Sequence, residues 1–102
     1  TAFDGINIKL MKCGSLSEAI DMIRLAREYN MKIMLGCMIE SSVSISAAYQ
    51  ISGEVDFLDL DGNLLINNDP FEGITVENGF LKGSLNPGIG VVLKNKYSSL
   101  LI

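Results

Sequence analysis

The residues best suited to chemistry are charged side chains that follow three apolar runs of the sequence. Lys9 ends the run GINIK, and Glu40 follows the run KIMLGCM. Asp59 and Asp61 lie at the end of the run VDFLDL. Charged groups are rarely buried without a partner. A charged residue at the end of an apolar run therefore indicates either exposure to solvent or a functional role. One lysine and a pair of carboxylates that meet at a common opening would form a site for a polar ligand.

The composition excludes several kinds of site. None of the 102 residues is a histidine, which excludes a zinc site and a Ser-His or Cys-His nucleophile pair on this chain. The two cysteines, Cys13 and Cys37, form no CxxC motif, which favours a reduced, cytoplasmic setting. The net charge of -4 argues against nucleic acid as a partner. No apolar run approaches the ~20 residues of a membrane span, so no membrane partner is expected.

Strands and helices are predicted to alternate through the first 60 residues. In residues 6–11, Ile6, Ile8 and Leu10 alternate with Asn7, Lys9 and Met11, which predicts a strand. A capping box at Ser15 and Glu18 begins a helix that ends near Asn30. Residues 32–38 predict a buried second strand.

A second helix and a third strand follow. Ser41 or Ser42 is predicted to cap a helix that continues to about Ile51, and residues 55–60 predict the third strand. Beyond Gly62 the turn signals predict short extended pieces and loops, with a hairpin in ITVENGFLKG. The structure of the final KNKYSSLLI is left open. At 102 residues the chain is one domain or part of one, and its opening residues suggest a piece of a larger protein.

This order predicts adjacent parallel strands covered by helices, with the charged residues at one edge. Short β-α-β connections give parallel neighbours, and such sheets bind ligands beyond the carboxyl ends of their strands. The alternation places Lys9 on the strand face away from the helices, whereas Lys12 is expected to be a solvated charge. Asp59 and Asp61 are two residues apart in an extended segment, so they also share the strand face away from the helices. We therefore expect Lys9 and the two aspartates to converge.

Ordinary structural roles also fit each of these residues. A lysine at a strand end is commonly a surface charge, and a D-x-D-G segment is commonly a polar turn. Glu40 could cap the second helix, and Cys37 could be a small buried residue. The coincidence at three consecutive strand ends is what favours a site.

Three segments, in this order, carry a resemblance to a known family: NIKLMKCGS, GCMIES and DLDGNLLINNDPFEGI. They resemble the C-terminal part of the enolase superfamily, and more narrowly the dipeptide epimerases of its muconate-lactonizing subgroup. The similarity runs from Asp4 to about Val91. It implies a C-terminal portion, about three parallel strands with covering helices, of a TIM-like (β/α)7β barrel. Residues 1–91 would belong to the barrel domain, and residues 92–102 would be a tail.

The resemblance also implies roles for individual residues. Lys9 matches one of two acid/base lysines that flank the substrate α-carbon, and Asp59 and Asp61 match the pair that holds the dipeptide's α-ammonium. Cys37 and Met38 would line the substrate pocket with Glu40. The implied reaction inverts the α-carbon of the C-terminal residue of a dipeptide such as Ala-Glu, by 1,1-proton transfer through an enediolate that Mg²⁺ stabilises.

The resemblance has limits that shape the expectations. The family's usual Gly-Gly is Gly14-Ser15 in this chain. The Mg²⁺ ligands and the second lysine would lie on upstream strands, so the chain alone is expected to be inactive. Another reaction of the subgroup is the nearest alternative: cycloisomerase, o-succinylbenzoate synthase or N-acylamino acid racemase. A non-catalytic structural or interaction fragment is the other alternative. The parent protein is expected to be homo-oligomeric.

Overall fold

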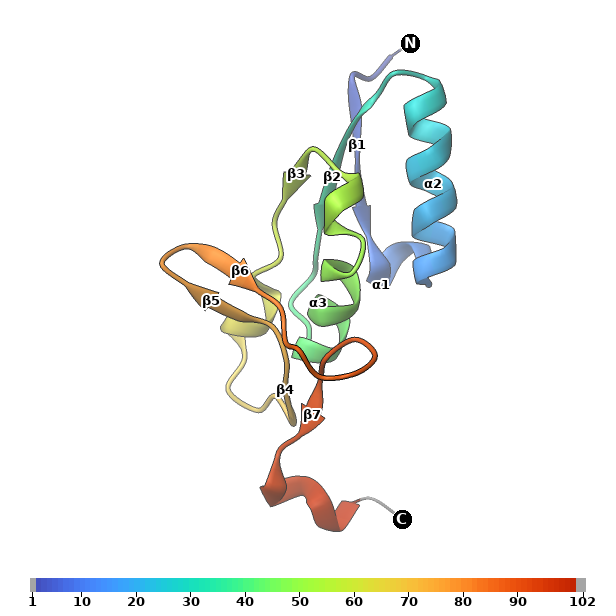
Figure 1. The fold of residues 1–102 in the computed structure, drawn as a ribbon. Coiled ribbons are helices and arrows are strands. Elements are labelled where there is room, and N and C mark those ends of the chain that lie inside the picture. Colours follow the sequence, from blue (N-terminus) through green and yellow to red (C-terminus); the bar gives the residue numbers. More distant parts are fainter. Residues whose placement is uncertain (1, 101–102) are drawn as a thin grey trace.

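The three predicted strands form one parallel sheet in the computed structural model, which describes residues 2–100. The strands β1 (Gly5–Lys9), β2 (Lys32–Gly36) and β3 (Phe57–Leu58) lie in the order β1-β2-β3, and both neighbouring pairs are parallel. Their carboxyl ends therefore lie at one edge of the sheet, toward the bottom of Figure 1. The predicted parallel α/β arrangement is confirmed.

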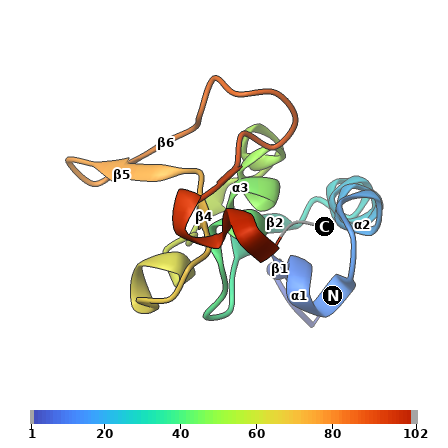
Figure 2. The ribbon, with the colours of Figure 1, turned by 90° about the horizontal axis from the view of Figure 1, so that it is seen from below.

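Two helices pack on one face of this sheet. Helix α2 (Leu16–Glu28) begins as predicted, because the Ser15 hydroxyl accepts the backbone N–H of Glu18 at 3.1 Å. The chain after α2 turns through Asn30, whose φ is 54°. Helix α3 (Ser42–Tyr49) lies beside α2 on the same side of the sheet, as the view along the strands shows (Figure 2).

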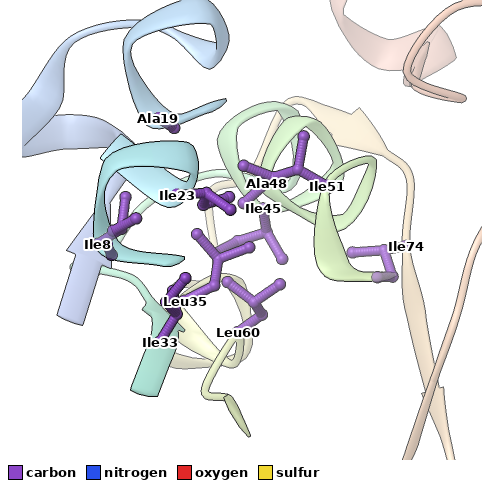
Figure 3. Close-up of a cluster of buried hydrophobic side chains, with 11 residues drawn as sticks. Ile8, Ala19, Ile23, Ile33, Leu35, Ile45, Ala48, Ile51, Leu60 and Ile74 are labelled. Carbon is purple, nitrogen blue, oxygen red and sulfur yellow. The ribbon is translucent and has the colours of Figure 1, made fainter. Parts of the chain in front are cut away.

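The buried core lies between the sheet and these helices (Figure 3). Ile8, Ile33 and Leu35 from the strands are at most 1% exposed, and they meet Ile23 of α2 and Ile45 of α3. The alternate residues face the other way: Asn7 is exposed, and Phe57 keeps 58% of its surface in contact with solvent. The apolar face of β1 thus meets the helices, which leaves Asn7 and Lys9 on the opposite face.

The boundaries of all three strands differ from the sequence prediction, and β2 ends at Gly36 and not at residue 38. Residues 10–13 form the short helix α1 (Leu10–Cys13) instead of extending β1, because Gly14 adopts a left-handed φ of 93° and donates its N–H to the Leu10 carbonyl at 2.8 Å. The third strand is shorter than residues 55–60. It follows the 3-10 helix η1 (Ser52–Glu54), and among residues 2–100 it pairs only with β2. Single hydrogen bonds from Asp56 and Asp59 extend this contact.

The C-terminal segment is extended and looped, as predicted. The 3-10 helix η2 (Gly62–Leu65) leads to β4 (Phe71–Glu72), which pairs antiparallel with β7 (Val92–Leu93). The predicted hairpin is present as β5 (Thr75–Glu77) and β6 (Phe80–Lys82). Its turn uses positive φ angles at Asn78 and Gly79, as a two-residue Asn-Gly turn requires.

The described chain ends in the 3-10 helix η3 (Asn95–Leu100), far from the N-terminus (Figure 1). The molecule measures 51 × 33 × 23 Å along its principal axes, so it is elongated. The domain boundary at residue 91 stays a prediction, and residues 101 and 102 of the predicted tail lie outside the described residues. Within residues 2–100, no helix combines the length and the apolar character that crossing a membrane requires.

Candidate functional site

Lys9 is the last residue of β1 and pairs with Gly36 of β2. Its side chain reaches toward the segment that leaves β2, where Nζ lies 3.9 Å from the Met38 sulfur. Helix α1 begins at the next residue, so the chain turns away and leaves the lysine at the rim of the sheet. The structure therefore places Lys9 on the sheet edge that the sequence predicted.

Asp59 and Asp61 lie at the same edge, beyond β3. The backbone N–H of Asp59 donates to the Leu35 carbonyl at 3.0 Å, which fixes the aspartate beside the end of β2. Leu60, between them, is 3% exposed and belongs to the core. Because successive side chains of an extended segment point in opposite directions, both aspartates face away from the core, and both are exposed.

Cys37 and Met38 connect the lysine to Asp61. The Cys37 sulfur lies 3.9 Å from Oδ1 of Asp61, while Met38 contacts Lys9. Burial raises the pKa of the Cys37 thiol; hydrogen bonds from the Gly62 and Asp61 backbones act against this, and the carboxylates of Glu40 and Asp61 add to it. Cys37 is therefore a neutral thiol at pH 7. Side-chain contacts thus run from β1 through the end of β2 to the segment after β3.

Glu40 does not cap α3, and neither does the side chain of Ser41. The cap is Asp69, whose Oδ2 accepts the backbone N–H of Ser42 at 2.8 Å and whose Oδ1 accepts that of Phe71 at 3.1 Å. Ser41 occupies the N-cap position, within the predicted choice of Ser41 or Ser42, but without a capping side-chain hydrogen bond. The alternative cap by Glu40 is wrong, because the carboxylate that accepts the Ser42 N–H comes from a distant segment. The Asp-Pro pair at residues 69–70 is a turn signal that marks the place but does not reveal the partner.

One oxygen of Glu40 has an unusual environment. Its Oε2 atom is buried and has no hydrogen-bond partner among residues 2–100. Burying a carboxylate oxygen without a partner is costly, so such an atom is typical of a group that receives a ligand or another segment. The assignment of Glu40, like that of Lys9, Asp59, Asp61, Cys37 and Met38, to substrate chemistry stays a prediction.

The charges at this edge do not neutralise one another. None of the ion pairs found among residues 2–100 involves Lys9, Asp59 or Asp61. In the same part of the chain, no three Cys, Asp or Glu side chains come together as a metal site. The residues present therefore do not fit a Mg²⁺ ion by themselves.

Two hollows lie near these elements. One, of about 340 Å³, is lined by Lys9 together with Asn7, Lys12 and Glu18. It lies at the edge of β1 that has no paired strand among residues 2–100. A second, of about 490 Å³, lies between α3, β4 and β7, and none of the predicted site residues lines it. The candidate site is thus an open rim on this chain and not an enclosed cavity.

Comparisons with known proteins show which sequences and folds this chain resembles. The sequence is 57% identical over 91 residues to the L-Ala-D/L-Glu epimerase of Bacteroides thetaiotaomicron, covering 89% of this chain and 24% of that protein. The dipeptide epimerase of Methylococcus capsulatus, solved with Mg and the dipeptide L-Arg-D-Lys, superposes with a TM-score of 0.79 at 40% identity, covering 84% of this chain and 25% of that one.

A relative with a different substrate has a similar backbone. The N-succinyl Arg/Lys racemase of Bacillus cereus superposes with a TM-score of 0.84 at 28% identity, covering 96% of this chain and 27% of that one. The chain thus spans about a quarter of the length of the relatives it matches. The sequence profile of the enolase C-terminal domain-like family matches residues 1–97. With three parallel strands and covering helices that match solved members, this chain belongs to the enolase C-terminal domain-like family.

Proposed function

We propose that the chain is the carboxyl-terminal part of a Mg²⁺-dependent dipeptide epimerase, in which it supplies one acid/base lysine and the binding site for the substrate's amino group. The observation that carries this proposal is the arrangement at the carboxyl edge of the sheet, the rim formed by Lys9, Cys37, Met38, Asp59 and Asp61. There, contacts through Cys37 and Met38 connect Lys9 to Asp61. The similarity to dipeptide epimerases, at up to 57% identity among the relatives described above, supports it.

Lys9 would transfer the proton at the α-carbon of the C-terminal residue. In its amine form Nζ accepts the α-proton, and the electrons of the broken C–H bond move into the adjacent carboxylate to give an enediolate. A second lysine, from the part of the protein outside this chain, would return a proton to the opposite face. The configuration is then inverted, with no net change in protons or electrons.

Asp59 and Asp61 would bind the free α-ammonium of the dipeptide. An amino terminus presents a positive charge with N–H donors, and hydrogen bonds between charged partners are the strong ones. Both carboxylates are exposed at the rim and form no ion pair among the described residues, so their oxygens are available. Met38 and Ile39, which are 45% and 67% exposed, give the rim an apolar part.

The ligands of the Mg²⁺ would come from outside this chain, because no three Cys, Asp or Glu side chains among residues 2–100 come together as a metal site. A bound Mg²⁺ supplies positive charge that stabilises a developing enediolate. A cytoplasmic location and a homo-oligomeric parent also stay predictions.

Racemisation of an N-acylated amino acid is the second candidate, because the backbone resembles that of the N-succinyl Arg/Lys racemase. Such substrates have no free α-ammonium, so the two exposed aspartates would have no charged amino terminus to bind. The aspartate pair therefore favours dipeptides.

Deuterium exchange in the full-length protein tests the choice. Incubation with Mg²⁺ in deuterated water should introduce deuterium at the α-carbon of the C-terminal residue of L,L-dipeptides, and the Lys9→Ala variant should lose this exchange. Exchange only into N-acylated amino acids would transfer the assignment to the second candidate. Absence of exchange into either class would leave a non-catalytic role.

A further inference from the structure

We propose that Cys37 is a positioning residue that holds the Asp61 carboxylate in the orientation that receives the substrate's ammonium group. The proposal rests on the function proposed above for Asp61. It gives Cys37 a role through another side chain, in place of the direct pocket-lining role that the family resemblance implies.

The first observation is the contact between the two side chains. The Cys37 sulfur lies 3.9 Å from Oδ1 of Asp61, with the thiol as donor and the carboxylate as acceptor. The backbone of Gly62 and Asp61 also acts on this sulfur, where hydrogen bonding lowers the pKa of the thiol against the larger effect of burial. Cys37 therefore lies against the residue that it would orient.

The second observation is how tightly this junction is packed. A Cβ atom at Gly62 would collide with the Met38 carbonyl oxygen and would lie 3.3 Å from the Cys37 sulfur. The start of η2 and the end of β2 therefore approach as closely as a glycine allows, and this approach restricts the rotamers open to Cys37. Because burial keeps Cys37 as a neutral thiol, it retains the proton that it donates.

Asp59 provides a contrast within the same pair. Its position is fixed by its backbone N–H, which donates to the Leu35 carbonyl at 3.0 Å. Asp61 follows the end of the β2–β3 contacts and leads into η2, so its carboxylate depends on a neighbouring side chain for its direction. Cys37 supplies that neighbour.

Kinetics of the full-length enzyme with L-Ala-L-Glu and Mg²⁺ test the role. Cys37→Ala removes the donor and should raise KM about 3- to 10-fold while kcat stays within about twofold, because the lost contact orients a binding group and not the base. Cys37→Ser keeps a hydroxyl donor and should restore KM to within about twofold of the wild type. Cys13→Ala is the matched control and should leave both constants unchanged, since the Cys13 thiol donates to the backbone carbonyls of Leu10 and Ser15 and not to an aspartate.

A double-mutant cycle separates positioning from simple space filling. In an Asp61→Ala background, Cys37→Ala should add no further rise in KM, because the group that it orients is gone. An undiminished rise in that background would overturn the proposal. So would a Cys37→Ser variant that behaves like Cys37→Ala.

A second measurement does not depend on turnover. The rate of alkylation of Cys37 as a function of pH, followed by mass spectrometry of its peptide, reports the pKa of the thiol. Asp61→Ala removes a negative charge beside the sulfur and should lower this pKa, whereas Asp59→Ala should leave it unchanged. If the enzyme is active but the pH dependence of Cys37 alkylation is unchanged in Asp61→Ala, the contact between Cys37 and Asp61 is refuted. A shifted profile in a protein that exchanges no dipeptide proton would refute the proposed function and leave the Cys37–Asp61 contact standing.

Discussion

The two ends of the parallel sheet use the same kinds of charged residue in opposite ways. At the amino end, Asp56 precedes β3, and its Oδ2 lies 2.7 Å from Arg27 while its Oδ1 lies 3.4 Å from Lys32. Its Oδ2 also accepts the Ile33 backbone N–H at 2.8 Å. At the carboxyl end, Lys9, Asp59 and Asp61 enter none of the ion pairs found among residues 2–100.

This difference separates charges that hold the fold from charges that are free to act. The Ile33 N–H, followed by the Arg27 guanidinium, lowers the pKa of Asp56 to about 2, which is what a satisfied structural carboxylate shows. Charges without an ion-pair partner at the carboxyl edge of a barrel sheet are the ones that can meet a charged substrate. Partners, more than residue type, distinguish the two ends.

The largest effect is expected from removing the lysine of the carboxyl end. In the full-length enzyme, Lys9→Ala should reduce kcat by about 10²- to 10⁴-fold, the usual contribution of an acid/base group, without changing the thermal midpoint. Lys12→Ala is the matched control and should retain activity, because Lys12 is an exposed residue of α1. Equal losses in both variants would contradict the distinction between the two lysines.

Neutralising one aspartate of that end should give the next largest effect. Asp59→Asn keeps the size of the side chain but removes its charge, so KM for dipeptides with a free amino group should rise about 10- to 100-fold. Steady-state kinetics with the same dipeptide acetylated at its amino terminus provides the control. A similar rise in KM for both substrates would contradict a role in ammonium binding.

Asp69 sharpens the comparison, because it lies near the carboxyl end but has structural partners. Asp69→Ala removes the cap of α3 and should lower the free energy of unfolding by about 0.5–2 kcal/mol, measured by chemical denaturation. Asp21→Ala, which removes an exposed pair with Arg24, should change it by less than about 0.5 kcal/mol. Equal effects would show that partners do not decide the role of a carboxylate in this fold.

The smallest effect is expected at the amino end and should appear as a dependence on pH. The folded-state pKa of Asp56, about 2, lies below its ordinary 3.8, so its stabilising contribution is complete above pH 3.8 and is lost as the pH falls toward 2. Asp56→Asn should remove this part of the acid dependence of the denaturation midpoint and leave kcat unchanged. A variant with the wild-type acid profile would contradict the assignment.

Sequence patterns predicted the elements of the sheet well, because each pattern reports a local preference. The capping box at Ser15 and the Asn-Gly turn of the hairpin depend on residues within a few positions of one another. The alternation in residues 6–9 reported which face of β1 is buried. It could not show that the chain turns into α1 at Leu10, since Leu10 and Met11 continue the same alternation.

The missed features are those that depend on contacts between distant residues. Asp69 caps a helix that begins 27 positions earlier, and no pattern near Ser42 indicates it. Asp61 and Cys37 are 24 positions apart, so a sequence reading could treat Cys37 only as a small apolar residue or a pocket wall. The sequence pattern predicts too long a third strand, because hydrophobicity does not reveal that β3 has a hydrogen-bonded neighbour on one side only within the described part of the chain.

The distant cap of α3 has a consequence for how the chain is made. A ribosome adds residues from the amino terminus, so Ser42 emerges well before Asp69 exists. Until the aspartate arrives, the first turn of α3 has no carboxylate to accept the Ser42 N–H, and the Ser46 hydroxyl has not yet met the backbone of Ile74. Completion of α3 is therefore a late event of synthesis, timed by the segment that follows the last strand of the sheet.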